Sequence, residues 1–255
     1  MKIFGAYTAV IGCGAARFAD ALGAHCHDVV LLPPCRTLDA RVAPHPDMLL
    51  ARLGDTLIAA EEYAAQPDAG QALSRIVSQT RCTLSLSAHP LGKRYPDDVG
   101  YNILTAGGYV YGLACRLSPD VRAKAAELGL HLRSVRQGYA GCSALVCGTL
   151  VLSADPSILF AAARDGAEVL PLSPSGVSLD GYSCGFIGGA SGFAENTAVF
   201  FGDVSLHPSA PALLRELERH GISVLSLGTA PLADFGGIRL LKNRANGCIS
   251  GNAVV

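Results

Sequence analysis

The chain has 255 residues, of which half are hydrophobic and 16% are charged, and its formal net charge is −1. So small a charge gives no basic field for nucleic acid, and with no Trp and few aromatic residues the chain offers no base-stacking surface. No apolar run reaches the roughly 20 residues that a membrane-spanning helix needs, so neither nucleic acid nor a membrane is an expected partner.

The first predicted elements are a strand over "YTAVIG", a helix, and a second strand over "DVVLL". A lipoprotein signal ending at Cys13 is the alternative, because "MKIFGAYTAVIGC" combines a Lys, an apolar run and a terminal Cys. Only one basic residue precedes that run, and Gly5 and Tyr7 interrupt it. We therefore expect a strand here, and a cytoplasmic protein.

The nine cysteines are scattered, with an odd count and no Cys-x-x-Cys pair. Such single cysteines are typical of small buried residues in a reducing compartment. The segment "GCGAARF" imitates a dinucleotide-binding loop, but Arg17 replaces the third Gly and no acidic residue ends the strand that follows. His25 and His27 would share one face of a strand, from which the intervening Cys26 points away. The sequence predicts no cofactor and no metal site.

A repeated unit follows along the chain. Hairpins are predicted at Gly54-Asp55, Gly107-Gly108 and Gly148-Thr149, and a fourth with a longer loop in "FIGGASGFAENTAVFFGD". A helix follows each hairpin, and then a further strand. Helix starts are marked by the N-cap candidates Ser118 and Asp155 and by Pro67, Pro119, Pro156 and Pro208. Helix ends are marked by Gly23, Gly129, Gly166 and Gly221.

The unit is therefore strand, strand, helix, strand, and residues 1–255 form one domain of five copies. The first strands are expected to begin near Met48, Ile103, Ala144, Phe186 and Ile238. The N-terminal copy lacks its first strand, and the C-terminal "GGIRLLK" is a first strand without a copy, so the two ends together close a ring. A doubly wound sheet is the alternative, but it does not explain a hairpin before every helix. The last segment, "NRANGCISGNAVV", could instead form a hairpin with "GGIRLLK".

Five ββαβ units around a pseudo-fivefold axis resemble the pentein fold of the guanidine-modifying enzymes. The segments "APHPD", "YPDDVGYN", "QGYAGCS", "GFIGGASG" and "GDVSLHP" resemble more narrowly a family of uncharacterised bacterial proteins of that fold. The resemblance implies a nucleophilic cysteine after a Gly-rich run near the C-terminus. In "DFGGIRLL" that place is held by Arg239, Leu240 or Leu241, and Cys248 comes at least seven residues later. This departure puts the usual chemistry of the fold in doubt.

The loops that precede the first strands are expected to converge at one end of the axis. They bring Asp39, Asp47, Asp97, Asp98, Asp180 and Asp234 against Arg41, Arg94 and Arg136. A net acidic mouth would favour a small cationic ligand, guanidino or amino. The other interpretation of each Asp is that it caps its own turn.

Cys142 is the candidate nucleophile at this mouth, with His45 as its base and Asp97 or Asp98 holding the cationic end of a substrate. On the other interpretation, Cys142 and Cys184 are only small residues packed near the axis. Further ligand contacts are expected from Tyr101, Asn102, Tyr139 and Tyr182.

Three functions therefore stay open at this point. The first is a ligand-binding pentein without the usual chemistry, and the second is a Cys142-dependent hydrolase or amidinotransferase-like enzyme. The third is a non-catalytic scaffold for protein interaction. The sequence does not indicate the oligomeric state.

Overall fold

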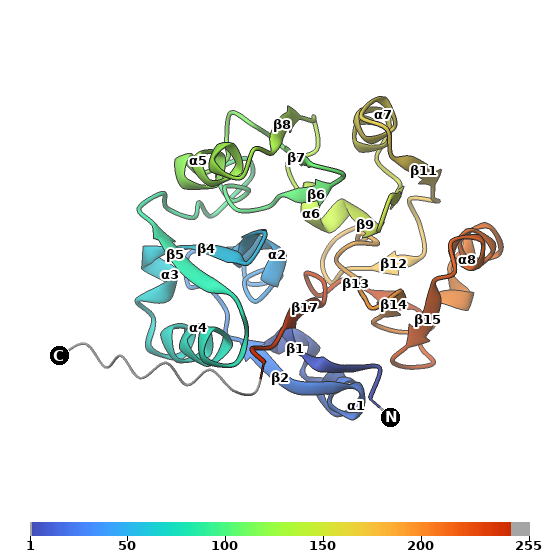
Figure 1. Cartoon of the computed structure of the whole chain (residues 1–255), viewed down its shortest axis with the longest axis horizontal. Helices are drawn as coiled ribbons and strands as arrows, with labels where there is room; N and C mark the ends of the chain where they lie inside the picture. Colours follow the sequence, from blue (N-terminus) through green and yellow to red (C-terminus); the bar gives the residue numbers. More distant parts are fainter. Residues whose placement is uncertain (1, 246–255) are drawn as a thin grey trace.

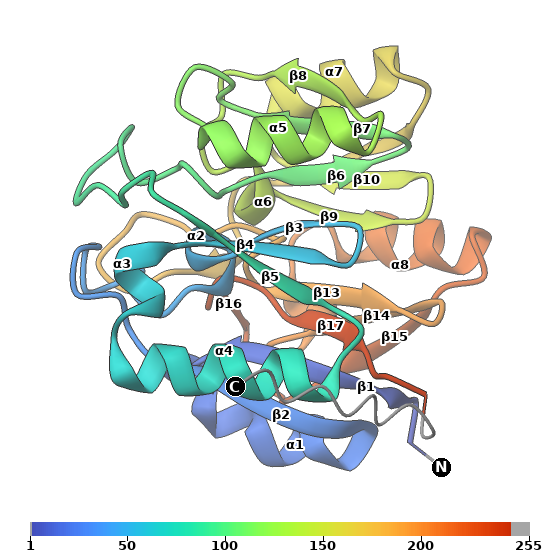
Figure 2. The same cartoon turned by 60° about the vertical axis from the view of Figure 1, so that its left-hand side comes forward.

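The computed structural model describes residues 2–245. Five small three-stranded sheets stand around a central axis, with the longer helices on the outside of the ring and two short helices inside it (Figures 1 and 2). The predicted ring of ββαβ units is thereby confirmed. A sixth, two-stranded sheet joins β12 (Val177–Ser178) in parallel to β16 (Leu232–Ala233).

Every three-stranded sheet has the same order and the same sense. The first strand pairs antiparallel with the second, and the second pairs parallel with the third. The first strands are β3 (Ala51–Leu53), β6 (Leu104–Ala106), β9 (Ala144–Cys147), β13 (Ser191–Ala194) and β17 (Arg239–Lys242). The second strands are β4 (Thr56–Ala60), β7 (Tyr109–Gly112), β10 (Leu150–Ser153), β14 (Thr197–Phe200) and β1 (Phe4–Gly12). The third strands are β5 (Thr83–Ser87), β8 (His131–Ser134), β11 (Glu168–Pro171), β15 (Ser223–Ser226) and β2 (Cys26–Leu32).

The helices lie between the second and third strands of their units. They are α3 (Glu61–Ala64), α4 (Pro67–Gln79), α5 (Pro119–Glu127), α7 (Pro156–Arg164), α8 (Ala210–Arg219) and α1 (Ala19–His25). Two 3₁₀ turns, Cys13–Phe18 and Val204–Leu206, precede α1 and α8. Two further short helices, α2 (Pro46–Leu49) and α6 (Ala140–Ser143), lie inside the ring and lead into β3 and β9, whereas the longer α4, α5, α7 and α8 lie outside it.

The ring is closed by the two ends of the chain. β17 pairs antiparallel with β1, in the register Thr8 opposite Leu241 and Val10 opposite Arg239. The hydroxyl of Thr8 also donates to the side-chain oxygen of Asn243 at 2.8 Å. The segment that precedes Cys13 is therefore β1, the middle strand of the fifth sheet. The alternative hairpin of the last segment lies largely outside the described residues, because 246–255 are not described.

The predicted helix starts are mostly confirmed. The Ser118 side chain accepts from the N–H of Asp120, and the Asp155 carboxylate accepts from the N–H groups of Ser157 and Ile158. Three of the predicted helix ends are also confirmed, since Gly129, Gly166 and Gly221 have φ of +67°, +93° and +66°. Pro208 is an exception among the starts, since it precedes α8 by two residues.

Two local predictions are wrong. Helix α1 continues through Gly23 to His25, so this glycine does not end the helix. The fourth hairpin has a two-residue turn, because Glu195 and Asn196 both adopt positive φ, of 47° and 51°. Its first strand therefore begins at Ser191 and not near Phe186, and the Gly-rich segment 186–190 is the loop before it. The hairpin itself was predicted, but its turn contains no glycine, so the position of the turn could not be recognised in the sequence.

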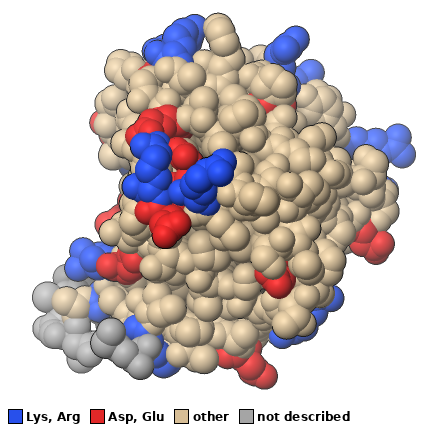
Figure 3. Space-filling model, turned by 90° about the vertical axis from the view of Figure 1, so that its right-hand side faces the viewer, with Lys and Arg blue, Asp and Glu red and all other residues tan. Residues whose placement is uncertain are grey.

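Charged groups are thinly spread on the side of the ring that carries α8 and β15. On this face most residues are uncharged, and acidic and basic side chains adjoin in one mixed cluster (Figure 3). Among residues 2–245, no helix combines the length and the apolar character needed to cross a bilayer.

Candidate ligand site at the hub of the ring

The residues that lead into the first strands meet at the axis and form what we call the hub. Its polar members are His45, Asp47, Asn102, Cys142, Asp234 and Arg239. Glycines let the backbone segments approach one another closely there. A Cβ on Gly188 would lie 2.4 Å from the carbonyl oxygen of Ala144, and one on Gly236, at φ +80°, would lie 2.4 Å from Cβ of His45. The Gly-Gly pairs of "GFIGGASG" and "DFGGIRLL" are thus required by packing.

The hub divides two cavities that open at opposite ends of the axis. The axial cavity, of about 450 Å³, runs between the five first strands and reaches the surface at the exposed hairpin glycines Gly54 and Gly148. The loop-end cavity, of about 400 Å³, lies on the other side, between the loop 40–45 and the segments around β12 and β16. The sequence predicted a single mouth, so this division was not foreseen.

Asp47 lines the axial cavity and is almost fully buried, with 1% of its surface exposed. Helix α2 positions it, and its own N–H donates to the carbonyl oxygen of Gly236 at 3.2 Å. Neither of its carboxylate oxygens has a hydrogen-bond partner among the described residues. Buried polar groups nearly always form hydrogen bonds, so this carboxylate is an unsatisfied acceptor that a bound ligand could pair with.

Arg239, the first residue of β17, lines the same cavity. Its Nε atom is buried and has no partner among the described residues. No nitrogen of Arg239 lies within 4.0 Å of a carboxylate oxygen in residues 2–245, so Arg239 forms no ion pair with Asp47. Asp47 is nevertheless close enough for its charge to affect the pKa of Arg239. Burial lowers the pKa of Arg239, and the carboxylate of Asp47 opposes that effect.

Asp234 and His45 face the loop-end cavity. The Asp234 carboxylate accepts from the N–H groups of Phe186 at 2.9 Å and Gly236 at 3.0 Å, and its Oδ1 lies 3.7 Å from Nδ1 of His45. Burial, and then repulsion from Asp47, raises the pKa of Asp234 to about 7. Burial lowers the pKa of His45, so this imidazole is neutral at neutral pH.

Cys142 is buried at the hub and lines neither cavity. Its sulfur accepts from Nδ2 of Asn102 at 3.0 Å, and Asn102 in turn accepts from the N–H of Gly141 at 2.6 Å. Burial, the negative charges of Asp47 and Asp234, and the closeness of the thiol to the Asp47 carboxylate raise the pKa of the Cys142 thiol well above its usual range. The contact between this thiol and Asp47 does not have the geometry of a hydrogen bond, so the Asp47 oxygens stay without a partner among the described residues. No hydrogen bond joins Cys142 to His45 in the described part of the chain. The Asn102 amide favours the thiolate, but burial and the two carboxylates outweigh that effect, so the thiol stays protonated.

An amidine electrophile at pH 7.5 is therefore expected to leave Cys142 unmodified while it labels the exposed Cys13 and Cys115. The thiol of Cys142 is both protonated and inaccessible. Intact mass and peptide mapping after incubation with chloroacetamidine would measure this. Stoichiometric labelling of Cys142 ahead of Cys13 would contradict it.

The loop-end cavity is not the net acidic mouth predicted from the sequence. Asp180 and Asp234 line it, but so do Arg17 and Arg41. Arg41 forms a bidentate pair with Asp39, donates to the carbonyl oxygen of Gly181, and stacks on the ring of Tyr182 with its guanidinium carbon 4.5 Å from the centroid. Arg41 thus ties the loop of the first unit to that of the fourth.

The other predicted ligand residues are dispersed. Asp97 pairs with Arg116 in solvent, and the Tyr101 hydroxyl donates inside the core to the carbonyl oxygen of His89. Asp98 is buried and accepts from the Tyr139 hydroxyl at 2.9 Å. The remaining oxygen of Asp98 has no partner among the described residues, and burial raises its pKa.

Nor do the three tyrosines share one environment. Tyr101 is fully buried, Tyr139 is half-buried, and Tyr182 is 46% exposed. Cys184 lies elsewhere, in a third cavity of about 120 Å³. The loops that precede the first strands differ in length and in turn type, so equivalent residues in them do not all reach the hub.

Arg239 and Arg52 are the site residues that the sequence did not reveal. Arg239 stands where the resemblance implies a cysteine, and Arg52 of β3 belongs to no motif. The signal was present, because a charged residue within an otherwise apolar inner strand must face either solvent or a cavity.

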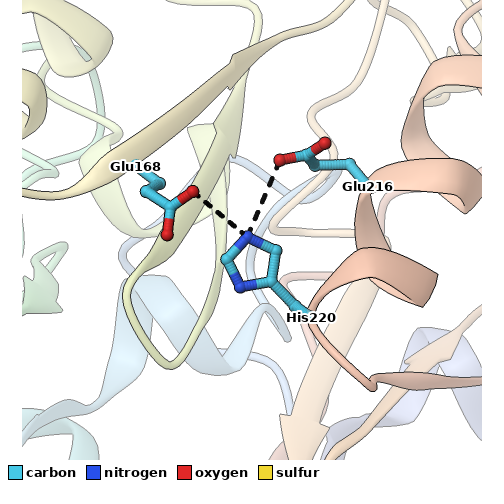
Figure 4. Close-up of side chains that lie close together, drawn as sticks. All are labelled: Glu168, Glu216 and His220. Atoms are coloured by element: carbon cyan, nitrogen blue, oxygen red, sulfur yellow. Dashed lines mark ion pairs between the residues drawn. The ribbon is translucent and has the colours of Figure 1, made fainter.

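One group outside the hub has the composition of a metal site. Glu168, Glu216 and His220 place one oxygen or nitrogen each within 4.8 Å of one another, from β11 and from the end of α8 (Figure 4). The guanidinium of Arg219 already contacts all three, including Oε1 of Glu216 at 2.6 Å and Nε2 of His220 at 2.8 Å. We interpret the group as a surface ion-pair network that links two neighbouring units.

The ring of five ββαβ sheets around a polar hub defines the class of protein: this is a pentein fold. Among solved structures, the chain is similar to a Cys-to-Ser variant of dimethylarginine dimethylaminohydrolase (DDAH) from Pseudomonas aeruginosa in complex with citrulline. The identity is 13% and the TM-score 0.51, over 89% of this chain and 92% of that one. A dimethylarginine dimethylaminohydrolase adduct with 4-chloro-2-hydroxymethylpyridine is similar at 13% identity and TM-score 0.50, over 89% and 93%. At this identity the likeness concerns the fold alone.

The particular family follows from the sequence model that matches residues 14–239. The chain belongs to that family, which is described as a family of unknown function (DUF6873). A search of curated proteins found no match.

Proposed function

We propose that this pentein binds a small molecule with a guanidino or amino group in its axial cavity, and that it does so without cysteine chemistry. The observation that carries the proposal is the Asp47 carboxylate, which is buried at the cavity wall with both oxygens unpartnered among the described residues. Leaving a buried carboxylate unpaired costs several kcal/mol, about 3 or more, and a cationic donor removes that cost.

Guanidinium and ammonium groups suit this carboxylate in both charge and hydrogen bonding. Asp47 offers two acceptor oxygens, which a guanidinium can engage in a bidentate pair. The cavity, of about 450 Å³, is within the size range of small-molecule sites. Its wall is formed largely by residues of the five first strands, so a bound molecule would be enclosed by rigid elements.

Two features support binding without turnover. The Gly-Gly run before β17 is followed by Ile-Arg-Leu-Leu, so the cavity has no thiol from this strand. The thiol nearest to Asp47 is that of Cys142, which is protonated, buried and hydrogen-bonded by an amide. A nucleophile needs an adjacent base, and the candidate base His45 faces the other cavity.

The competing hypotheses gain less support. A Cys142-dependent hydrolase would require a thiolate where burial and the carboxylates of Asp47 and Asp234 raise the pKa of the thiol. A protein-interaction scaffold would favour a flat, closed axis, whereas this axis contains a cavity that reaches the surface. The hydrolase is a defined outcome of the experiment below.

The experiment is a thermal-shift and calorimetric titration with guanidine, agmatine, arginine and putrescine. At least one compound should raise the melting temperature, and Asp47→Asn should weaken its binding by about tenfold or more, because a charged hydrogen bond contributes roughly 1.5–3 kcal/mol. The control is Asp20→Asn, at an exposed position in the first turn of α1, which should bind as the parent does.

Turnover is measured in the same samples as ammonia and urea released. Release that disappears in Cys142→Ser would overturn the non-catalytic part of the proposal and favour the hydrolase. Absence of any shift, or a shift unaffected by Asp47→Asn, would overturn the assignment of the cation site.

A further inference from the structure

The axial cavity carries more positive than negative charge on its wall. Two guanidinium groups line it, those of Arg239 and Arg52, and Asp47 is the one acidic side chain among its described lining residues. Since Asp47 does not lie within 4.0 Å of any guanidinium, the three charges do not neutralise one another by contact. A cation site at Asp47 does not explain why two guanidinium groups line the same cavity.

Arg52 is held in place by backbone. Its Nε donates to the carbonyl oxygen of Gly54 at 3.1 Å, and its Nη1 donates to the carbonyl oxygen of Leu240 at 3.1 Å. It also lies 4.0 Å from the exposed carboxylate of Asp55. These contacts bridge β3 to β17 and fix a positive charge near the hairpin-turn end of the cavity.

Arg239 is different, because it makes no hydrogen bond and no ion pair with any residue that the structure describes. Its Nε is sealed from solvent, while its side chain as a whole keeps some surface that faces the cavity. A guanidinium group keeps its charge in proteins and presents a planar array of donors that matches a two-oxygen anion. An enclosed guanidinium with none of these donors used is a preformed receptor for such an anion.

We propose that Arg239 is an oxyanion-binding site, which takes a carboxylate or phosphate group that enters the axial cavity from the hairpin-turn end, with Arg52 adding to the positive field along the way. The two oxygens would accept from the Arg239 guanidinium. This site goes beyond the cation site at Asp47 and can be occupied without it. The carboxylate and the phosphate are distinguished by experiment.

The test uses inorganic phosphate and malonate in separate titrations, with sodium chloride at matched ionic strength as the reference. At least one oxyanion should stabilise the full chain more than chloride does, and Arg239→Gln should weaken its binding by about tenfold or more. The matched control is Arg81→Gln, at an exposed arginine outside the cavity, which should bind as the parent does. Stabilisation equal to that by chloride, or equal in Arg239→Gln, would overturn the site.

A second measurement does not depend on a variant that folds. Phenylglyoxal modifies accessible arginines, and peptide mapping reports each one. The bound oxyanion should protect Arg239 by severalfold and should leave Arg81 unprotected. Equal protection of both, or of neither, would overturn the proposal.

The Asp47→Asn variant separates this proposal from the proposed function. Oxyanion binding should persist in it, because removing the carboxylate removes repulsion for an anion. Loss of guanidino binding with retained oxyanion binding supports both sites. Guanidino binding that is present in the parent and lost in Asp47→Asn, with no oxyanion binding in either protein, would refute the Arg239 site alone.

Discussion

Substitution of Gly188 by alanine is expected to destabilise the protein by about 1–3 kcal/mol, toward the upper end of that range. A Cβ at this position would lie 2.4 Å from the carbonyl oxygen of Ala144 and 2.5 Å from that of Cys142. Both obstacles are backbone atoms at the hub, so no side-chain rotation can relieve them. The segments that lead into β9 and β13 would have to separate.

Urea denaturation at fixed pH would measure the change, with Gly23→Ala as the matched control. Gly23 lies within helix α1, and a Cβ there would meet no atom within 4 Å. That variant should gain about 0.5–1 kcal/mol, because alanine is the better helix former. A loss below 1 kcal/mol for Gly188→Ala would show that the hub can rearrange and that the close approach of its segments is not required.

Replacement of Asp234 by asparagine is expected to change how stability depends on pH. The folded pKa of this carboxyl, about 7, lies above its usual value of 3.8. The folded state therefore holds its proton more tightly than the unfolded state does. The stability from Asp234 is fully present below pH 4 and is lost as the pH rises through 7. The expected loss across this range is on the order of a few kcal/mol.

The free energy of unfolding of Asp234→Asn minus that of the parent should accordingly increase between pH 4 and pH 8. Nearby titratable groups are His45, Asp47 and Cys142. The lowered pKa of His45 acts in the opposite direction, since its contribution is present above pH 6.5 and is lost as the pH falls below that. Because His45 is common to both proteins, it cancels largely in the difference. A difference independent of pH, measured by urea denaturation, would show that Asp234 is not held protonated.

The repeat was predictable because local chemistry marks it. Glycine turns, proline helix starts and glycine helix ends recur in the same order, and Gly54, Gly148 and Gly129 adopt the positive φ that their positions predict. Where that chemistry was absent, as in the Glu195-Asn196 turn, the boundaries were misplaced. The ring itself followed from matching the two ends of the chain.

The hub was less predictable, because it depends on which side of a loop each residue faces. Asp47 and His45 are two residues apart, yet one lines the axial cavity and the other the loop-end cavity. Asp97 and Asp98 are adjacent, yet one is in solvent and the other is buried. Sequence spacing places a loop near the axis, but it does not determine the conformation that aims each side chain.

Pairing of β17 with β1 has a consequence for how the chain reaches its native state. The contact between Thr8 and Asn243 joins residues 235 positions apart, so β1 has no antiparallel neighbour until nearly the whole chain has been synthesised. Local hairpins form in about 1–10 µs, whereas bringing together such distant segments is penalised by chain entropy. We therefore expect the four sheets that are each built from one continuous stretch of chain, those of β3, β6, β9 and β13, to assemble first. The fifth sheet should form late, and hydrogen exchange in β1 would report this final step of folding.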